Sequence, residues 1–343
     1  MNVKKPRAVR TAALEALAAA QADPRKVPLV YAGFSALLSL AVTVISYILA
    51  QKIDQMTGLA NLGNRAILST IKSTLPFAQL IFLMIWEFSY QMCALGFARR
   101  RAIDPQNLKD GFIRFGPILR AKVLMGFVYA GMALVAMYLS VFIFMALPIS
   151  NAFYEIVAPL LDSASILNST ITIDEATITA ASAAMWPVFV IFAVVFMVVS
   201  LPTFYGFRMV NFCIADNGPR GAIAAMKESR AMMKGHKRDL FKLDLSFWWF
   251  FLLEGLIGVI AYLDMILPMV GISLPWSDTI SYYGFYVLSL ACQVGLYWAY
   301  LNRVTVSQAI FYDAIRPQAS AAGGVTLGNI FDLAKDYYQD NKE

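Results

Sequence analysis

The sequence has few of the residues on which most catalytic and metal sites depend. It contains one histidine, His236, and three cysteines, Cys93, Cys213 and Cys292. It has no CxxC, HExxH, GxSxG, phosphate-binding loop or dinucleotide-binding fingerprint. The cysteines lie in or beside apolar segments, away from an oxidising exterior, so we expect no disulfide. We therefore expect no metal, no cofactor and no enzymatic activity.

Charge is also scarce, since 15% of the 343 residues are charged and 59% are hydrophobic, with a mean hydropathy of +0.62. Soluble domains carry about a quarter charged residues. The apolar residues form blocks free of Lys and Arg, each long enough for a helix to cross a bilayer, which takes about 20 residues. The blocks are 27–50, 75–97, 123–147, 185–207, 247–270 and 282–301. They predict an all-α membrane protein with about six transmembrane helices.

The positions of the basic residues predict the orientation of these helices. Six Lys and Arg residues precede the first block, seven lie in 99–122, eight in 208–242, and four follow the last block. The loops on the other side hold only Lys52, Arg65 and Lys72. Basic loops stay in the cytoplasm, so we expect both termini there. This explanation of the net charge of +6 makes nucleic acid an unexpected partner.

Three segments with helix-start or helix-stop residues precede the first, third and fifth blocks. The first, 7–22, stops before a proline, the second opens at Asp104-Pro105 and closes at Gly116-Pro117, and the third runs over 222–234. We expect basic amphipathic cytoplasmic helices between the helix pairs. The predicted organisation is a cytoplasmic amphipathic N-terminal segment, a six-helix transmembrane domain and a mobile cytoplasmic tail, at 1–26, 27–316 and 317–343.

The third segment has apolar residues at helical spacing and a basic side. Its apolar face could lie among lipid headgroups while its cations meet anionic lipid or a partner protein. Alternatively, the helix could pack on the protein itself, and the sequence leaves both possibilities open. The basic residues are Lys227, Arg230, Lys234 and Lys237.

A weak internal repeat supports a division into three units. Gln91-Met92-Cys93 at the inner end of the second block matches Asn211-Phe212-Cys213 at the inner end of the fourth, and Asn302 takes a similar place after the sixth. Each unit would consist of an amphipathic helix, an outward span and a return span.

Glu87 and Glu254 are the candidate intramembrane polar site. An ionisable group inside a span costs about 2.5–3.5 kcal/mol on insertion scales, so each is a functional candidate. They lie at similar depth, and with no Lys or Arg inside the blocks to neutralise them, they could share or exchange a proton, as in proton-coupled transport. The alternative is that each is hydrogen-bonded to a neighbouring helix and holds the bundle together.

The stretch from Ala222 to Leu256 and two shorter elements, Asp110-Gly111-Phe112 and Ala309-Ile310-Phe311-Tyr312, resemble the recurrent signature of a bacterial integral membrane family, domain of unknown function 975. The matching residues in the stretch are Glu228, Ser229, Arg230, Met232, Met233, Gly235, Leu240, Phe241, Leu243, Leu245, Ser246, Phe247 and Trp249. The resemblance implies a multi-pass protein of the bacterial cytoplasmic membrane and implies no activity.

The sequence therefore predicts an integral membrane protein without a recognisable catalytic site. Its function would be that of a transporter, or of an accessory protein in export or another membrane process. The alternative is a non-transporting scaffold or assembly factor that binds anionic lipid on the cytoplasmic face or a membrane-protein partner.

Overall fold

The structure, a computed structural model, describes residues 5–56, 61–148, 150–151, 154–155, 175–217, 221–269 and 278–316. The predicted tail at 317–343 lies outside these residues. The elements are α1 (Pro6–Ala18), α2 (Lys26–Gln55), α3 (Leu62–Ala98), the 3-10 helix η2 (Pro105–Arg114), α4 (Phe115–Ala146), α6 (Glu175–Phe207), α7 (Val210–Asn217), α8 (Ala222–Met232), α9 (Lys237–Leu245), α10 (Trp248–Ile260), α11 (Leu263–Met269), α12 (Asp278–Leu296), the π-helix η3 (Tyr297–Leu301) and α13 (Asn302–Ile315).

The predicted all-α membrane fold is confirmed. Five helical segments are long and apolar enough to cross a membrane, and α9 with α10, bent by 66°, can supply a sixth. The fifth block is not one straight helix, because a turn at Ala261-Tyr262 separates α10 from α11. Helix α4 begins at Phe115 and carries Pro117 in its first turn, where a missing backbone N–H costs nothing. The expectation that a helix closes at Gly116-Pro117 is therefore wrong.

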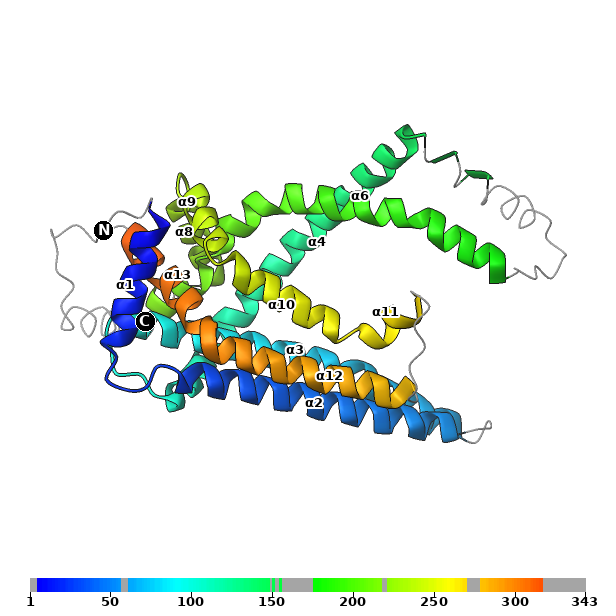
Figure 1. Ribbon diagram of the computed structural model, residues 1–343, viewed down its shortest axis with the longest axis horizontal. Coiled ribbons are helices and arrows are strands. Elements are labelled where there is room, and N and C mark those ends of the chain that lie inside the picture. Colours follow the sequence, from blue (N-terminus) through cyan, green and yellow to red (C-terminus); the bar gives the residue numbers. More distant parts are fainter. Residues whose placement is uncertain are drawn as a thin grey trace, which may run out of the picture.

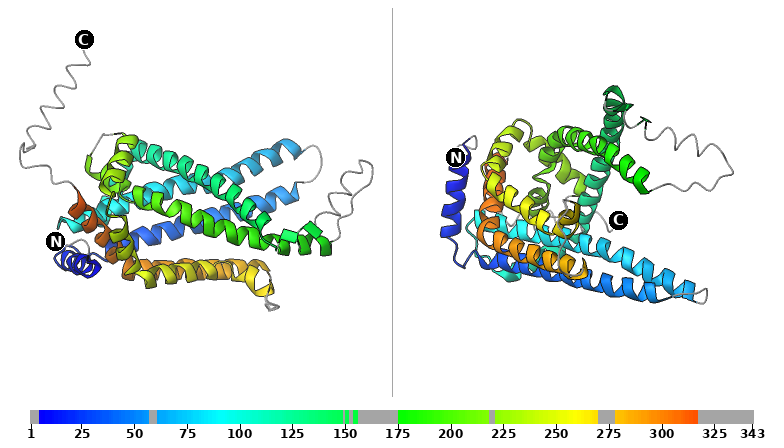
Figure 2. Two further views of the ribbon diagram at one scale, coloured as in Figure 1. Left: turned by 90° about the horizontal axis from the view of Figure 1, so that it is seen from above. Right: turned by 45° about the vertical axis from the view of Figure 1, so that its right-hand side comes forward.

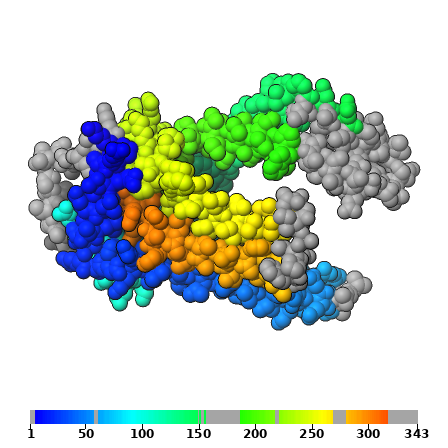
Figure 3. Space-filling view, in the orientation of Figure 1, coloured from blue at the N-terminus to red at the C-terminus, as the bar shows by residue number. Residues whose placement is uncertain are grey.

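The spans form two arms (Figures 1 and 2). Helices α2, α3 and α12 pack side by side with α10 on α12, and we call this group the first arm. Helices α4 and α6 pack on each other and form the second arm. Figure 3 shows an open gap between α6 of the second arm and α10 of the first. The arms have exposed apolar surfaces, as expected of helices that face lipid.

The arms converge on a compact end that we call the head (left in Figure 1), made of α1, η2, α7, α8, α9, α13 and the inner ends of the spans. Most fully buried large side chains lie here, including Phe88, Leu108, Met209 and Met233. Helix α13 is its centre, with Phe311 and Tyr312 fully buried. The three segments expected to precede the odd-numbered spans all lie in the head, where they bury part of their surface against the protein.

Helix η2 lies close against α3. Asp104 and Asn107 form a reciprocal capping box at its start. A Cβ at Gly111 would stand 2.8 Å from the Cα of Ser89, so only glycine permits this approach. Phe112 then packs on the ring of Phe82, with centroids 5.3 Å apart. The Asp-Gly-Phe element thus fixes η2 on α3.

Candidate functional site

The two predicted intramembrane carboxyls, Glu87 of α3 and Glu254 of α10, line the same cavity, whose volume is about 390 Å³. A second cavity of about 410 Å³ shares three of its lining residues, and we call the two together the chamber. The shared residues are Tyr31, Glu87 and Tyr297. Both arms contribute to the chamber, so it lies where they meet.

Glu87 has a cationic partner. The Nζ of Lys122 on α4 lies 3.3 Å from Glu87 Oε2, and Gln91 Nε2 donates a hydrogen bond to Glu87 Oε1 at 2.9 Å. The expectation that no basic residue neutralises this carboxyl is therefore wrong. Lys122 precedes the apolar block 123–147 by one residue, and its flexible four-carbon side chain allows its ammonium to reach Glu87. The pair also links the first arm to the second.

Glu254 is bound differently, because its partner is a hydroxyl. Tyr297 Oη donates to Glu254 Oε1 at 2.7 Å and accepts from Gln293 Nε2 at 3.2 Å. Tyr297 is the first residue of η3, and π-helical segments occur often at functional sites. Among the described residues, no Lys or Arg forms an ion pair with Glu254.

Arg208 brings a second cation to the chamber. It lies at the break between α6 and α7 and lines the cavity that holds Glu254. Its guanidinium carbon is 5.2 Å from the centroid of the Phe204 ring, and its Nε is buried without a hydrogen-bond partner. The chamber thus contains charges of both signs.

The chamber lies at the closed end of the gap between the arms. Its lining includes Phe204 from the last turn of α6 and Phe251 from the first turns of α10. These two rings are 40% and 38% exposed and lie on the two helices that face each other across the gap. Polar groups therefore stand at the base of an opening with apolar walls. No group of three His, Cys, Asp or Glu side chains that could hold a metal occurs in the part of the chain that the structure describes.

The basic helix of the third segment, α8, packs on the protein. Ala222, Ala225 and Met232 are buried, and the Oγ of Ser229 donates to the carbonyl oxygen of Gly206 at 2.8 Å. Ile223, one of the apolar residues at helical spacing in this segment, is 59% exposed. One face of this helix therefore packs on the protein, and contact of its basic side with lipid or a partner stays a prediction.

The four basic residues predicted there are on the outside of this helix or just after it. Lys227, Arg230 and Lys234 are exposed. The Arg230 guanidinium lies over the Phe207 ring at 4.5 Å, and Lys237 lies close to Gly206. Arg230 and Lys237 thus contact the inner end of α6, while Lys227 and Lys234 stay available to a lipid surface or a partner.

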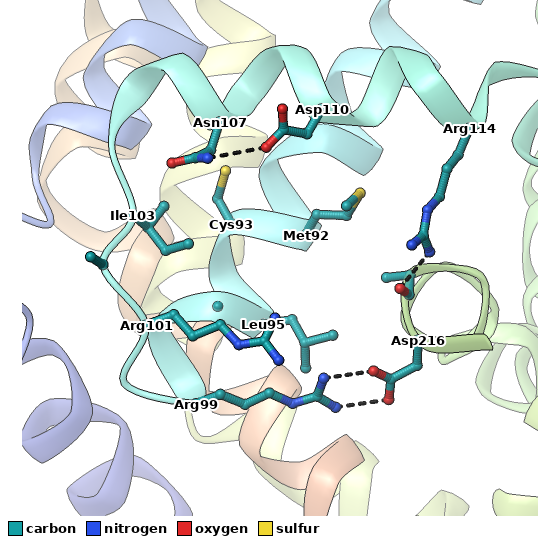
Figure 4. A pocket seen from close by; sticks show the side chains of 13 residues that line it. Met92, Cys93, Leu95, Arg99, Arg101, Ile103, Asn107, Asp110, Arg114 and Asp216 are labelled. Atoms are coloured by element: carbon teal, nitrogen blue, oxygen red, sulfur yellow. Dashed lines mark hydrogen bonds and ion pairs between the residues drawn. The ribbon is translucent and has the colours of Figure 1, made fainter. Parts of the chain in front are cut away.

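An ion-pair network in the head joins three chain segments, and Figure 4 shows the pair that Arg99 and Asp216 form in it. The guanidinium of Arg99, directly after α3, binds both carboxylate oxygens of Asp216 on α7 at 2.6 and 2.7 Å. It also binds both oxygens of Asp313 on α13, at 3.1 and 2.6 Å. Arg316 and the Tyr312 hydroxyl bind Asp216 as well. Beside the network is a pocket of about 490 Å³.

The titration of Asp216, which lies beyond the apolar block 185–207, reflects this network. Burial would raise the pKa of Asp216, but the hydrogen bonds and charge of Arg99, the charge of Arg316 and the Tyr312 hydroxyl together lower it below its usual value. Asp216 is therefore ionised in the folded head at physiological pH, and its charge is compensated by two arginines.

The positions paired by the weak repeat lie close together. Asn211 Nδ2 donates to Gln91 Oε1 at 2.8 Å, and Tyr90 Oη, next to Gln91, donates to Asn302 Oδ1 at 2.5 Å. The Asn302 amide also donates to the carbonyl oxygen of Pro24. The inner ends of the three return spans thus meet through these polar groups.

Several residues that carry the family signature lie in the core of the head, whereas Phe241, Leu245 and Trp249 are exposed. Ser229, Met233, Leu240 and Leu243 are at most 1% exposed, and Gly235 has a φ of +91°, which favours glycine. In the second element, Ala309, Phe311 and Tyr312 are fully buried. None of these residues lines the chamber. The signature therefore describes how the head is built.

Sequence reasoning identified the two carboxyls but missed Lys122, Arg208, Tyr31 and Tyr297. Lys122 and Arg208 each lie one residue outside an apolar block, and a search for basic residues within side-chain reach of the block ends could have found them. Nothing in the sequence marks the tyrosines, since tyrosine is common at membrane interfaces and 16 occur in the chain.

The fold and chamber define an α-helical integral membrane protein with two arms, a helical head and a polar chamber between them. The chain belongs to the family described as protein of unknown function (DUF975), whose model matches residues 4–319. No curated protein and no solved structure matches the chain significantly.

The pair between Glu87 and Lys122 generates a first prediction. Substitution Lys122→Met leaves a carboxylate without its cation in an apolar region, so we expect the melting temperature of the purified protein to fall by a few degrees. Adding Glu87→Gln to this variant removes the uncompensated charge and should restore most of the loss. A double variant that melts below both single variants would contradict the pairing.

The lowered pKa of Asp216 generates a second prediction. A group with a lowered folded-state pKa adds stability above its unfolded pKa, roughly 3.9 for Asp, and this stability is lost as pH falls through the folded pKa. We therefore expect Asp216→Asn to lower the melting temperature at pH 7, with the difference from wild type shrinking below about pH 4. Melting curves between pH 3 and 7 measure it, and a difference that is constant with pH would refute it.

Proposed function

We propose that the chamber binds the polar head of an amphipathic molecule that enters from the bilayer through the gap between the arms. The protein would act as a transporter of this molecule or as an accessory protein that handles it. The observation that supports this proposal is the position of the chamber, whose charged groups lie at the base of an opening flanked by exposed apolar surface.

The physical argument concerns solvation. Hydrocarbon cannot solvate Glu254 or Arg208, so charges at the base of such a gap need either water or a polar ligand. A molecule with a polar head and an apolar tail satisfies both parts of the site, since its head can bind in the chamber while its tail lies against the aromatic and aliphatic residues of the gap. The chamber volume, at about 390 Å³ for one of its two cavities, is in the range of small-molecule sites.

A proton-coupled form of this activity would rest on Glu254. Glu87 is held by Lys122, whereas Glu254 has only hydroxyl contact through Tyr297.

We further propose that the head faces the cytoplasm of a bacterial cell and that the membrane is the cytoplasmic membrane. The support is the charge distribution: the segments 99–122 and 208–242, rich in Lys and Arg, contribute to the head or its junction with the arms. Exposed cations such as Lys227 would then lie near the anionic lipids of the inner leaflet.

Orientation is testable by thiol labelling in a variant whose three cysteines are replaced. Ile113 in the head is 84% exposed, and Leu62 at the start of α3 is 55% exposed. In intact cells, a membrane-impermeant maleimide should label Leu62→Cys and leave Ile113→Cys unlabelled until the membrane is permeabilised. Labelling of Ile113→Cys in intact cells would reverse the proposed orientation.

Head-group binding is testable by measuring the lipid retained after purification in mild detergent. We expect native mass spectrometry to find bound lipid on the wild-type protein. The variant Glu254→Trp, which fills the chamber and removes the Glu254 carboxyl, should lose this lipid. The matched control is Asp264→Trp, because Asp264 is an acidic residue on α11 outside the chamber lining. Equal retention by both folded variants would refute a binding role for the chamber.

A further inference from the structure

Two charges in the chamber have no ion-pair partner, and they come from helices on opposite sides of the gap. Arg208 follows α6 of the second arm, and Glu254 belongs to α10 of the first. Neither forms an ion pair within the described part of the chain. Both are partly buried, so water alone solvates them incompletely.

Arg208 has donors to spare. Its Nε is buried and lacks an acceptor. Asp244 acts on it electrostatically, but no ion pair joins the two residues, and the oxygens of Asp244 accept hydrogen bonds from Tyr205 at 3.1 Å and Gln308 at 3.0 Å. A planar guanidinium with unused N–H groups is suited to a phosphate or carboxylate.

Glu254 has acceptor capacity to spare. Tyr297 donates to Oε1, whereas no hydrogen bond reaches Oε2 within the described residues. An ionised carboxylate can accept about four hydrogen bonds. A primary ammonium group would supply both the missing donors and the missing charge.

A ligand of a single charge fits this pair poorly. An anion at Arg208 would meet the negative charge of Glu254 in the same cavity, and a cation at Glu254 would meet the positive charge of Arg208. A group that carries both charges compensates both residues at once, as the phosphate and the ammonium do in an ethanolamine lipid head, where two carbon atoms separate the phosphate oxygen from the nitrogen. The other pair, Glu87 with Lys122, is already neutral as a unit.

We propose that the chamber selects a zwitterionic head group, with its phosphate or carboxylate at Arg208 and its primary ammonium at Glu254. This inference rests on the proposed head-group binding and adds the chemical class of the ligand. The ligand could be an aminophospholipid from the bilayer or a soluble zwitterion of the same head-group chemistry, and the test separates them.

The experiment uses the full-length protein, delipidated in mild detergent. Affinities are measured by native mass spectrometry for a phosphatidylethanolamine and a phosphatidylglycerol with identical acyl chains, because these lipids differ in the ammonium group. We expect about ten-fold tighter binding of phosphatidylethanolamine, the size expected of one charge-assisted hydrogen bond. Soluble glycerophosphoethanolamine serves as a competitor.

The variants assign the two ends of the ligand. Glu254→Gln should weaken phosphatidylethanolamine binding about ten-fold and remove the preference, while Arg208→Gln should weaken both lipids. Arg208→Lys keeps the positive charge and should therefore retain part of the lipid binding. This result would show that the weaker binding of Arg208→Gln is not caused by a loss of folding. Arg303→Gln, which changes an exposed arginine of α13 outside the chamber lining, is the matched control and should change neither affinity.

The outcomes separate the two proposals. Binding of both lipids with no preference, unchanged in Glu254→Gln, would overturn the zwitterion proposal while head-group binding stands. No lipid binding, together with tight binding of glycerophosphoethanolamine, would support the zwitterion site and overturn the amphipathic ligand. No binding of any of the three probes would overturn both.

Discussion

The ion pairs that the guanidinium of Arg99 forms with Asp216 and Asp313 are the interaction on which the rest of the structure depends. This guanidinium is the only described cation that binds two carboxylates at once, and these belong to α7 and α13, while Arg99 itself ends α3. The inner ends of all three return spans are thereby held at one point. Because the Asp216 side chain is nearly buried, its charge needs compensation, which Arg99, Arg316 and the Tyr312 hydroxyl supply. The arms diverge from this fixed point.

The hydrophobic core lies in the head, and not between the arms, because of the solvent that each part of the molecule faces. Arms that face hydrocarbon gain nothing from burying apolar side chains between helices, since lipid is equally apolar. In the proposed orientation the head lies outside the hydrocarbon and meets water, so it buries its hydrophobic residues as a soluble domain does. This difference explains why the family signature concentrates in the head. Residues such as Met233 and Leu243 specify packing there, whereas the arms require little beyond length and apolar character.

The sequence predicted the all-α class, the number of spans and the two chamber carboxyls, because these follow from hydropathy and from the cost of charge in lipid. It did not predict the helix boundaries well. Helix α3 begins at Leu62, in a polar stretch that hydropathy leaves out of the apolar block 75–97. It also missed the neutralisation of Glu87, which depends on the direction of the Lys122 side chain across two helices. Hydropathy carries no information about such tertiary contacts, nor about the π-helical turn that presents Tyr297 to Glu254.

The chamber and the head are connected through α6, α7 and α13, so a movement of residues in the chamber affects the head. Arg208, at the α6–α7 break, lies eight residues before Asp216, and Gln308, which lines the chamber, lies five residues before Asp313. Asp244, through Tyr205 and Gln308, joins α6, α9 and α13 between the two sites. A ligand that draws the guanidinium of Arg208 toward Glu254 would pull on the same short segment whose other end Arg99 holds. In the proposed function, the ion network would hold α7 and α13 in place while the arms bind a ligand between them.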